Sequence, residues 1–376
     1  MFVTIVARGV PSPRTPLWGI FELDQARALQ AAGHRVAILA LDVRSLRRVR
    51  GFGVLHQVID GIDVHTIRIP LGQVPDAVDQ AVLDRAFDAG FSRILSLHGA
   101  PDVVHAHFTK YALAAARSRH RRTFRLVVTE HNSKFSPQGI PLRLRRKAAE
   151  AYRKADAVVA VSEALAEVLT GAFDLPVQVL PNIVDVSTFA AQPRREHDSI
   201  RLVSVGNLLP RKRMALLVDG FALAFAERPE VELVLMGEGP ERSQIEARVT
   251  EAGLGDRVKL LGFRSRAQIA QEFAASDGFV LLSTWETFGV VFIEAMAAGL
   301  PVLSSRCGGP EGFLTEDRGM FAETGSAEEL AASLQTFVRH FRDWDRDHIV
   351  ARAQQDFSPS TVAAQLTEVY ARVCSH

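Results

Sequence analysis

The stretch STWETFGVVFIEAMAAGLPVLSSRCGGPE, residues 283–311, decides the fold of this chain. It follows an apolar run at 278–282 that predicts a strand, and its alanine-rich middle predicts a helix from Gly289 onward. Gly299, with a proline two residues later, is a typical helix stop. A second short apolar run at 301–304 predicts another strand. A strand, a helix and a strand so close together are typical of a parallel α/β unit.

Two glutamates, Glu286 in the loop and Glu294 inside the predicted helix, flank the helix N-terminus. The unpaired amides and positive dipole at a helix N-terminus favour an anion such as phosphate, and Gly289 has no side chain to block it. A carboxylate within the helix could accept hydrogen bonds from the hydroxyls of a sugar. The alternative is a pair of solvated glutamates on an amphipathic helix, but the apolar neighbours of Glu294 argue against an unpaired charge.

The pattern E-x7-E, followed by EAMAAGLPV and GGPE, resembles the donor-site signature of retaining glycosyltransferases of family 4, which have the GT-B fold. The resemblance implies an α/β protein with two Rossmann-like domains that face each other across a cleft. It also implies a C-terminal helix that crosses back to the first domain. We expect an acceptor-side domain at 1–185, ending in the hinge-like PNIVD, a donor domain at 186–355 and the crossover helix at 356–376.

The composition fits a two-domain protein. The 376 residues exceed one ordinary domain, and 47% hydrophobic with 23% charged residues is usual for a globular chain. Two cysteines cannot form a disulfide framework, and no Cys/His spacing resembles a zinc site. The N-terminus has the pattern of a strand, not of a signal peptide, and no apolar run reaches the ~20 residues of a membrane span. We therefore expect a cytoplasmic protein.

The net charge of +1 conceals an asymmetry between the two halves. Residues 1–185 carry 24 Lys and Arg against 17 Asp and Glu, a net of +7, whereas residues 186–376 carry 20 against 26, a net of −6. Basic residues gather in the run RSLRRVR at 44–50 and in a predicted helix at 141–155. Each segment could contact an anionic lipid surface or a diphosphate-bearing acceptor, or could be a solvated face. We keep peripheral membrane contact as a hypothesis and expect no nucleic-acid partner.

The chain opens with a predicted strand at 2–7, a Pro-rich loop, a helix at 19–32 and a strand at 35–41, the βαβ pattern of a Rossmann unit. No G-x-G-x-x-G follows the first strand, which argues against a dinucleotide site. The loop is long for this fold, and such loops are usually functional. The resemblance places its Gly19 near the transferring phosphate, whereas Trp18 could equally be an anchor in the core.

Histidines follow two of the next predicted strands. His105 and His107 alternate along one strand, so we expect both imidazoles on one face; a two-histidine metal site is one interpretation, but no matching carboxylate is evident. The strand at 126–129 delivers His131 to its carboxyl end, where open α/β sheets bind ligands. A neutral imidazole there can donate and accept hydrogen bonds. The resemblance makes His107 mostly structural and places His131 near the donor sugar.

In the second half, a strand at 201–205 leads into Asn207 and the cations Arg211, Lys212 and Arg213. Positive side chains between a strand end and a helix start could reach a diphosphate. Family members usually show G-R-L-x-x-x-K here; Lys212 matches the lysine, but Asn207 replaces the arginine, so one expected charge is missing. Arg211 or Arg213 could compensate for it.

The resemblance also supplies the rest of the donor site. It implies donor contacts from Arg264, near the nucleotide base, and from Phe288, Gly289 and Val290 at the helix start. The isolated D-x-D at 343–345 is a metal motif in another glycosyltransferase fold, but here it lies between helical stretches and is typical of a solvated turn. We expect neither a metal nor another cofactor.

Together these residues predict retaining transfer of a sugar from a nucleotide diphosphate sugar, with a UDP-sugar favoured over a GDP-sugar, to an acceptor hydroxyl. Lys212, its neighbouring arginines and the helix N-terminus would stabilise the departing diphosphate. Glu294 would hold the ribose, Glu286 the donor sugar, and His131 would orient that sugar. No nucleophile emerges, so the family implies same-face attack. The acceptor would be a lipid-linked sugar or a small molecule, in the synthesis of a glycan, a glycolipid or a glycosylated metabolite.

Two alternatives belong to other classes of function. One is a sugar-nucleotide 2-epimerase of the same fold, which would need further acid–base carboxylates, and the E-x7-E and GGPE pattern argues against it. The other is a catalytically silent protein that binds sugar nucleotides. Asn207 favours this second alternative, whereas the combination of Lys212, Glu286, Glu294 and His131 favours an enzyme.

Overall fold

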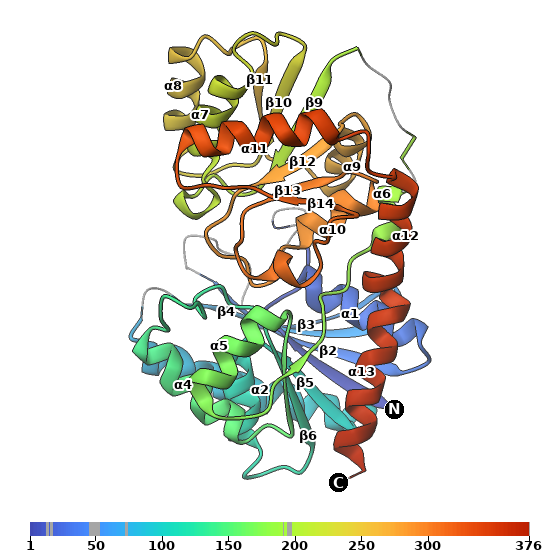
Figure 1. Cartoon of the computed structure of the whole chain (residues 1–376). Coiled ribbons are helices and arrows are strands. Elements are labelled where there is room, and N and C mark those ends of the chain that lie inside the picture. Colours follow the sequence, from blue (N-terminus) through green and yellow to red (C-terminus); the bar gives the residue numbers. More distant parts are fainter. Residues whose placement is uncertain are drawn as a thin grey trace. The chain divides into compact units, whose positions relative to one another are not determined.

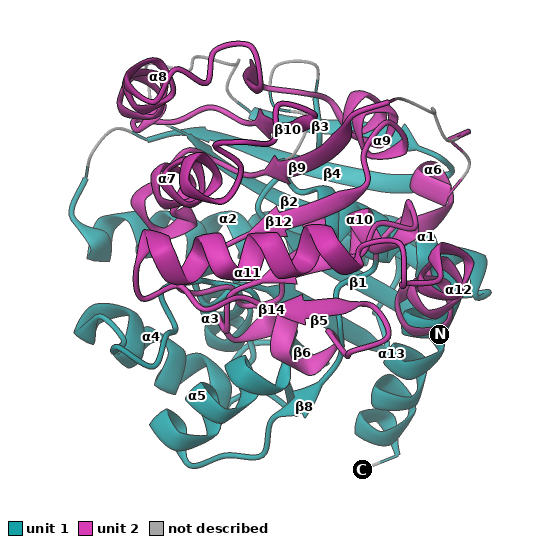
Figure 2. Cartoon of the chain, turned by 45° about the horizontal axis from the view of Figure 1, so that its top comes forward, with its two compact units in different colours: residues 1–183, 359–376 teal, residues 184–358 magenta. Residues whose placement is uncertain are grey.

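The computed structural model describes residues 1–12, 15, 18–44, 53–71, 74–190, 192–193 and 198–375. These residues form two compact units (Figure 1). Residues 1–183 and 359–376 make the first unit, and residues 184–358 make the second (Figure 2). Of the basic run at 44–50 only Arg44 is described, so the membrane contact predicted for that run lies outside the described residues.

Within the described part of the first unit, eight strands form one sheet in the order β3-β4-β2-β1-β5-β6-β7-β8. β3 runs antiparallel to β4, and the other neighbouring pairs are parallel. The strands are β1 (Phe2–Ala7), β2 (Arg35–Arg44), β3 (Gly53–Ile59), β4 (Ile62–Pro70), β5 (Val103–His107), β6 (Arg125–Glu130), β7 (Ala157–Ala160) and β8 (Gln178–Val179). β1 and β7 are buried along their whole length, as expected for parallel strands covered on both faces.

The helices of this unit include the last helix of the chain. They are α1 (Ile20–Ala31), α2 (Asp76–His98), α3 (Thr109–Ser118), α4 (Leu142–Arg153), α5 (Glu163–Phe173) and α13 (Pro359–Cys374). α13 packs on α1. Leu366 and Tyr370 of α13 share a buried core with Leu29 of α1 and Ile5 of β1. The C-terminal helix therefore returns to the first unit, beginning at Pro359.

The second unit is built on six parallel strands among its described residues, in the order β11-β10-β9-β12-β13-β14. The strands are β9 (Ile200–Val205), β10 (Val231–Met236), β11 (Val258–Gly262), β12 (Gly278–Leu281), β13 (Val302–Ser304) and β14 (Gly319–Phe321). The helices are α6 (Val186–Ala190), η2 (Pro210–Lys212), α7 (Met214–Ala224), α8 (Arg242–Glu251), α9 (Arg266–Ala274), α10 (Val290–Ala297), η3 (Gly309–Gly312), α11 (Ala327–His340) and α12 (Arg346–Phe357). Residues 283–311 thus contain α10 and β13, as predicted.

Both sheets have the doubly wound strand order of a Rossmann fold. The first contains β4-β2-β1-β5-β6-β7, and the second is β11-β10-β9-β12-β13-β14. In such sheets ligands bind beyond the carboxyl ends of the strands, where the strand order reverses. The reversal lies between β1 and β5 in one sheet and between β9 and β12 in the other. The residues that follow these strands are therefore the candidates for function.

The D-x-D at 343–345 is a turn and a helix cap. Asp345 precedes α12, and its carboxylate accepts hydrogen bonds from the amides of Asp347 (2.9 Å) and His348 (3.1 Å). The Asp343 carboxylate bonds His340 at 2.8 Å. The predicted turn is confirmed. Among the described helices, none combines the length and the apolar character needed to cross a membrane.

Candidate active site

A buried ion pair lies beyond the carboxyl ends of β9 and β12. Lys212, the last residue of η2, is only 8% exposed, and its Nζ donates a hydrogen bond to Oε1 of Glu286. Ser283 Oγ donates to the same oxygen at 2.6 Å, and Arg211 Nη1 lies 3.8 Å from Glu286 Oε2. The sequence predicts donor contacts for Lys212 and for Glu286 but does not indicate that the two residues pair with each other, as they do in the structure.

The glycines of GGPE hold the loop that carries Glu286. Glu286 donates its amide to the carbonyl of Cys307 at 2.7 Å, and its own carbonyl accepts the amide of Gly309 at 2.8 Å. Gly308 has φ 93°, and a Cβ there would lie 2.4 Å from the Trp285 ring. Only glycine tolerates both conditions, because other residues avoid positive φ and carry a Cβ. The motif therefore fixes the backbone from which Glu286 projects.

The N-terminus of α10 begins directly after this loop. Gly289 is its N-cap with φ 89° and without a side-chain cap, and Phe292 donates its amide back to the carbonyl of Gly289 at 3.0 Å. The amides of Val290 and of the residue after it are among those that a helix start leaves without intrahelical partners. The Phe288 side chain packs on Phe313 and belongs to the core. If Phe288 contacts the donor as predicted, it must therefore do so through its main-chain atoms.

Glu294, one turn into α10, is paired with a residue that the sequence did not indicate. It is 7% exposed, and Arg266 Nε donates to its Oε1 at 3.0 Å. Arg266 begins α9, which Ser265 caps. The predicted Arg264 lies two residues earlier and donates to the carbonyl of Phe263 at 3.1 Å. Arg266, and not the nearby Arg264, therefore pairs with Glu294.

The cations after β9 point in different directions. Lys212 and Arg211 lie at Glu286, whereas Arg213 Nη1 donates to Thr324 Oγ1 at 3.0 Å. Asn207 is exposed, and its carbonyl accepts the amide of Leu209 at 2.8 Å. Of the two residues predicted to compensate for Asn207, Arg211 is therefore the one beside the buried pair.

In the first unit, a buried carboxylate holds the segment after β6. Glu130 Oε1 accepts the amides of His131 at 2.8 Å and Asn132 at 2.9 Å. Its other oxygen accepts the Thr109 amide at 2.9 Å and the Tyr152 hydroxyl at 2.8 Å. Such a fully bonded carboxylate fixes the backbone around it. Glu130 thus sets the position of His131.

His131 lies against His107, and both imidazoles are neutral. His131 Nε2 and His107 Nδ1 share a hydrogen bond of 2.9 Å, and their rings stack. Burial, followed by the charge of Arg8, lowers the pKa of His131 from 6.5 to about 3, and burial lowers the pKa of His107 well below 6.5. His107, His131 and Asn182 line a small pocket. A neutral His131 can act as donor or acceptor but carries no charge.

His105 and His107 lie on the same strand face, as predicted, with ring centroids 4.6 Å apart. His105 Nδ1 bonds Tyr370 at 2.6 Å and Gln25 at 2.9 Å, and its Nε2 bonds Thr129 at 2.7 Å. Since protein groups occupy both of its nitrogens, His105 is a satisfied core histidine, and the structure does not support the two-histidine metal interpretation.

The loop after β1 is braced by Trp18 and Gly19. The Trp18 indole N–H donates to the Arg8 carbonyl at 2.8 Å, and the Arg8 guanidinium lies 5.0 Å from the Trp18 ring centroid. Gly19 is the N-cap of α1 with φ 76°, and a Cβ on it would lie 2.1 Å from the carbonyl oxygen of Gly9. Trp18 therefore braces the loop itself, and the close approach of Gly9 requires a glycine at 19.

We predict that Gly19→Ala destabilises the protein more than Gly33→Ala. The two glycines flank α1 with similar dihedrals, φ 76° and 86°, so both variants incur the cost of a left-handed alanine, about 1–2 kcal/mol. A Cβ at Gly33 meets nothing within 4 Å, whereas the Gly19→Ala clash with Gly9 adds roughly 1–3 kcal/mol. Urea unfolding of both variants checks the difference. Equal losses would show that the Gly9 contact relaxes without cost.

Two family models match the chain, and together they span residues 22–354. The model described as Glycosyltransferase Family 4 matches residues 22–188, and the model described as Glycosyl transferases group 1 matches residues 185–354, which include Lys212, Glu286 and Glu294. The chain belongs to glycosyltransferase family 4. The two matches to this glycosyltransferase meet at the boundary between its two units.

Known proteins agree with this assignment. The glycosyltransferase is 27% identical over 343 residues to the uncharacterized glycosyltransferase YqgM of Bacillus subtilis, an alignment that covers 86% of this chain and 94% of YqgM. Its fold is similar to that of sucrose-phosphate synthase from Thermosynechococcus elongatus, with a TM-score of 0.81, 23% identity and coverage of 100% and 99%. Anabaena HepE in complex with UDP and glucose matches with a TM-score of 0.74, 22% identity and coverage of 99% and 100%. These likenesses show a two-domain GT-B fold.

Sequence reasoning missed two residues that shape the candidate site of this glycosyltransferase. Arg266 was missed because no spacing rule links a helix start to a glutamate 28 residues later. The role of Glu130 could have been inferred from the sequence, because a carboxylate at the buried end of a strand requires hydrogen-bond donors nearby. The amides of the two residues after it supply two of them.

Proposed function

We propose that this glycosyltransferase transfers a sugar from a UDP-sugar to an acceptor hydroxyl, with retention of anomeric configuration and without a metal ion. The observation that carries the proposal is the arrangement in the second unit beyond β9 and β12. There, a buried lysine, a glycine-capped helix start and a buried glutamate within that helix follow strands at the switch point of one sheet. This combination suits a diphosphate that lies between two hydroxyl-bearing groups.

The diphosphate half of the proposal rests on Lys212, Arg211 and α10. As the bond to the sugar breaks, negative charge grows on the leaving diphosphate, and fixed cations and helix amides stabilise that charge. Lys212 is held at the site by Glu286. An arriving diphosphate would share the ammonium with Glu286, because the ammonium has three N–H donors. Three protein groups thus supply positive charge or dipoles, and a metal is not required.

The hydroxyl-binding half rests on Glu294 and Glu286. A carboxylate accepts about four hydrogen bonds, so the bond from Arg266 does not exhaust Glu294. We assign Glu294 to the ribose diol and Glu286 to hydroxyls of the donor sugar. His131 would orient that sugar as a neutral hydrogen-bonding group, in agreement with its lowered pKa.

The UDP-sugar and the stereochemistry rest on relatives. HepE of Anabaena, similar in fold, has been solved with UDP and with UDP-glucose, which supports UDP ahead of GDP. Retention by same-face attack, guided by the departing phosphate, is the family's expectation. For the acceptor, α4 exposes Leu142 (62%) beside the exposed Arg143, Arg145 and Arg146, a surface that supports a lipid-linked sugar at a membrane. A small soluble acceptor remains the second candidate.

The proposal is tested by turnover with UDP-glucose, UDP-N-acetylglucosamine and GDP-mannose, each with and without EDTA. We expect release of UDP from one UDP-sugar at the same rate in EDTA, and NMR of the product should show the anomeric configuration of the donor. Turnover only with added divalent metal would contradict the metal-independent mechanism. Conversion of the donor to its C2 epimer would identify an epimerase, and binding of UDP without release of sugar would identify a silent binding protein.

A further inference from the structure

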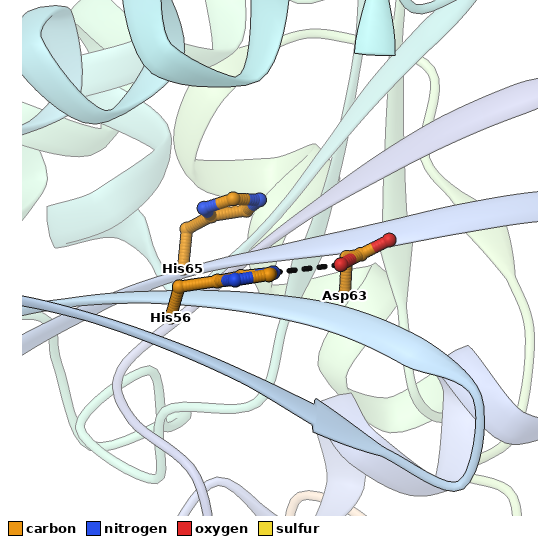
Figure 3. Close-up of side chains that lie close together, drawn as sticks. All are labelled: His56, Asp63 and His65. Atoms are coloured by element: carbon orange, nitrogen blue, oxygen red, sulfur yellow. Dashed lines mark hydrogen bonds and ion pairs between the residues drawn. The ribbon is translucent and has the colours of Figure 1, made fainter. Parts of the chain in front are cut away.

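The hairpin of β3 and β4, at the edge of the first sheet, brings together three side chains with metal-ligand chemistry. His56 on β3 lies directly opposite His65 on β4, and Asp63 precedes His65 by two residues. Side chains two residues apart on a strand share a face, and so do directly opposed residues. Figure 3 shows both imidazoles and the carboxylate on one side of the hairpin. Among the described residues, these three form the group of His, Cys, Asp or Glu side chains that lie close enough together to hold a metal ion.

The geometry is close to that of a metal site. One ring nitrogen of each histidine and one Asp63 oxygen all lie within 4.8 Å of one another. His56 Nε2 and Asp63 Oδ1 are 2.7 Å apart, and the two imidazoles stack with centroids 4.7 Å apart. In a tetrahedral zinc site, ligand bonds of about 2.0–2.2 Å place the donor atoms roughly 3.3–3.5 Å apart. Side-chain adjustments of about an ångström would therefore suffice.

His65 is prepared to act as a ligand. It is 0% exposed, and imidazole nitrogens are common metal ligands. Its Nδ1 is buried and has no hydrogen-bond partner among the described residues, and its Nε2 lies 3.0 Å from Nε2 of His98. His65 is thus a buried polar residue that contacts two other histidines, His56 and His98.

His98, which is hydrogen-bonded to His65, places the end of a helix beside this group. It is the last residue of α2, and the carboxyl end of a helix attracts cations. The negative charge of the Asp63 carboxylate would attract a cation. The positive charges of Arg93 and Arg35 would oppose its binding, and Arg35 donates a hydrogen bond to the His98 carbonyl at 2.7 Å.

We propose that His56, Asp63 and His65 bind one divalent transition-metal ion, and that Zn²⁺ is a suitable probe for it. Imidazole nitrogens with one carboxylate select this class of ion over Mg²⁺ or Ca²⁺. The ion would tie the edge strand β3 to β4. β3 needs such a tie, because it exposes Val54 (57%) and Val58 (62%) and buries little apolar surface. This site is structural and separate from the donor reaction.

The test is calorimetric titration of Zn²⁺ into the full-length chain after removal of metals with a chelator and dialysis. We expect one saturable site per chain and, with Co²⁺, the strong visible absorption of tetrahedral coordination. His56→Gln and Asp63→Asn should each weaken Zn²⁺ binding at least tenfold. Both residues lie at the surface of the hairpin, with side chains 40% and 37% exposed, so the variants should fold. The melting temperature should rise with Zn²⁺ in the wild type and not in the variants.

His340→Gln is the matched control, because it removes the histidine of another exposed His–Asp pair, His340 with Asp343. It should bind Zn²⁺ like the wild type. The absence of saturable binding in the wild type would overturn the proposal. Loss of affinity in His340→Gln equal to that in His56→Gln would show adventitious surface binding, and tight binding unchanged in both hairpin variants would place the ion elsewhere.

Discussion

Replacing Lys212 with methionine should lower kcat by about 10²–10³-fold, the usual loss when one group that stabilises developing negative charge is removed. Methionine keeps most of the length and apolar character of the lysine stem, so the change is mainly the loss of the ammonium. Lys212 is buried at the switch point of the second sheet, where positive charge has the largest effect because water is excluded. Steady-state kinetics with the nucleotide sugar that supports turnover in the experiment proposed above measures the loss.

Stability must be separated from catalysis in this experiment. Lys212→Met alone removes the ammonium from the buried Glu286 carboxylate, and breaking a buried pair in this way costs roughly 3–5 kcal/mol. The double variant Lys212→Met/Glu286→Gln removes both charges and should recover much of that stability while it stays inactive. Lys259→Met, on the exposed side of β11, is the control and should be fully active. Activity in the stable double variant near that of the wild type would disprove the role of Lys212.

Glu294→Gln should weaken UDP binding by about 10- to 100-fold, since a hydrogen bond to a charged group contributes about 1.5–3 kcal/mol. The side chain keeps its shape but loses the charge that pairs with Arg266 and that would accept the ribose hydroxyls. The rise in melting temperature that saturating UDP causes in the wild type should largely disappear at the same UDP concentration.

Glu272→Gln provides the matched control for this second prediction. Glu272 also pairs with an arginine of the second unit, Arg201, at 2.9 Å, but Arg201 lies near the amino end of β9, whereas the candidate site lies beyond the carboxyl ends of the strands. It should lose a similar amount of stability and keep its affinity for UDP. If both variants bind UDP as the wild type does, Glu294 serves only its ion pair with Arg266. Equal weakening in both would indicate a general loss of packing.

Local patterns in the sequence carry the fold, because each depends on residues close together in the chain. The switch from the apolar run at 278–282 to the helix after Gly289 predicts α10, and the structure has it at Val290–Ala297. The glycines of GGPE predict a turn, because glycine readily adopts the positive φ that turns require, and Gly308 has φ 93° in the structure. Repetition of such units along the chain predicted two Rossmann-like domains, and the observed strand orders confirm them.

Partners far apart in the sequence had to come from the tertiary structure. Lys212 and Glu286 are 74 residues apart, and they meet because β9 and β12 are neighbours in a doubly wound sheet. Arg266 reaches Glu294 because the start of α9 and the first turns of α10 come close in the fold. Electrostatic pairing depends on distance and burial, neither of which a single sequence states.

By itself the sequence determined the fold class and the family, and it indicated Lys212, Glu286, Glu294 and His131 as candidate site residues, since these follow from local periodicity and from a long composite motif. Only the tertiary structure decided which charges are paired, that His131 is neutral, and that the hairpin of β3 and β4 gathers His56, Asp63 and His65. The physical reason is that secondary structure depends on neighbours in the chain. The charge state and ligand geometry of a side chain depend instead on neighbours in space, which the packing of strands and helices supplies.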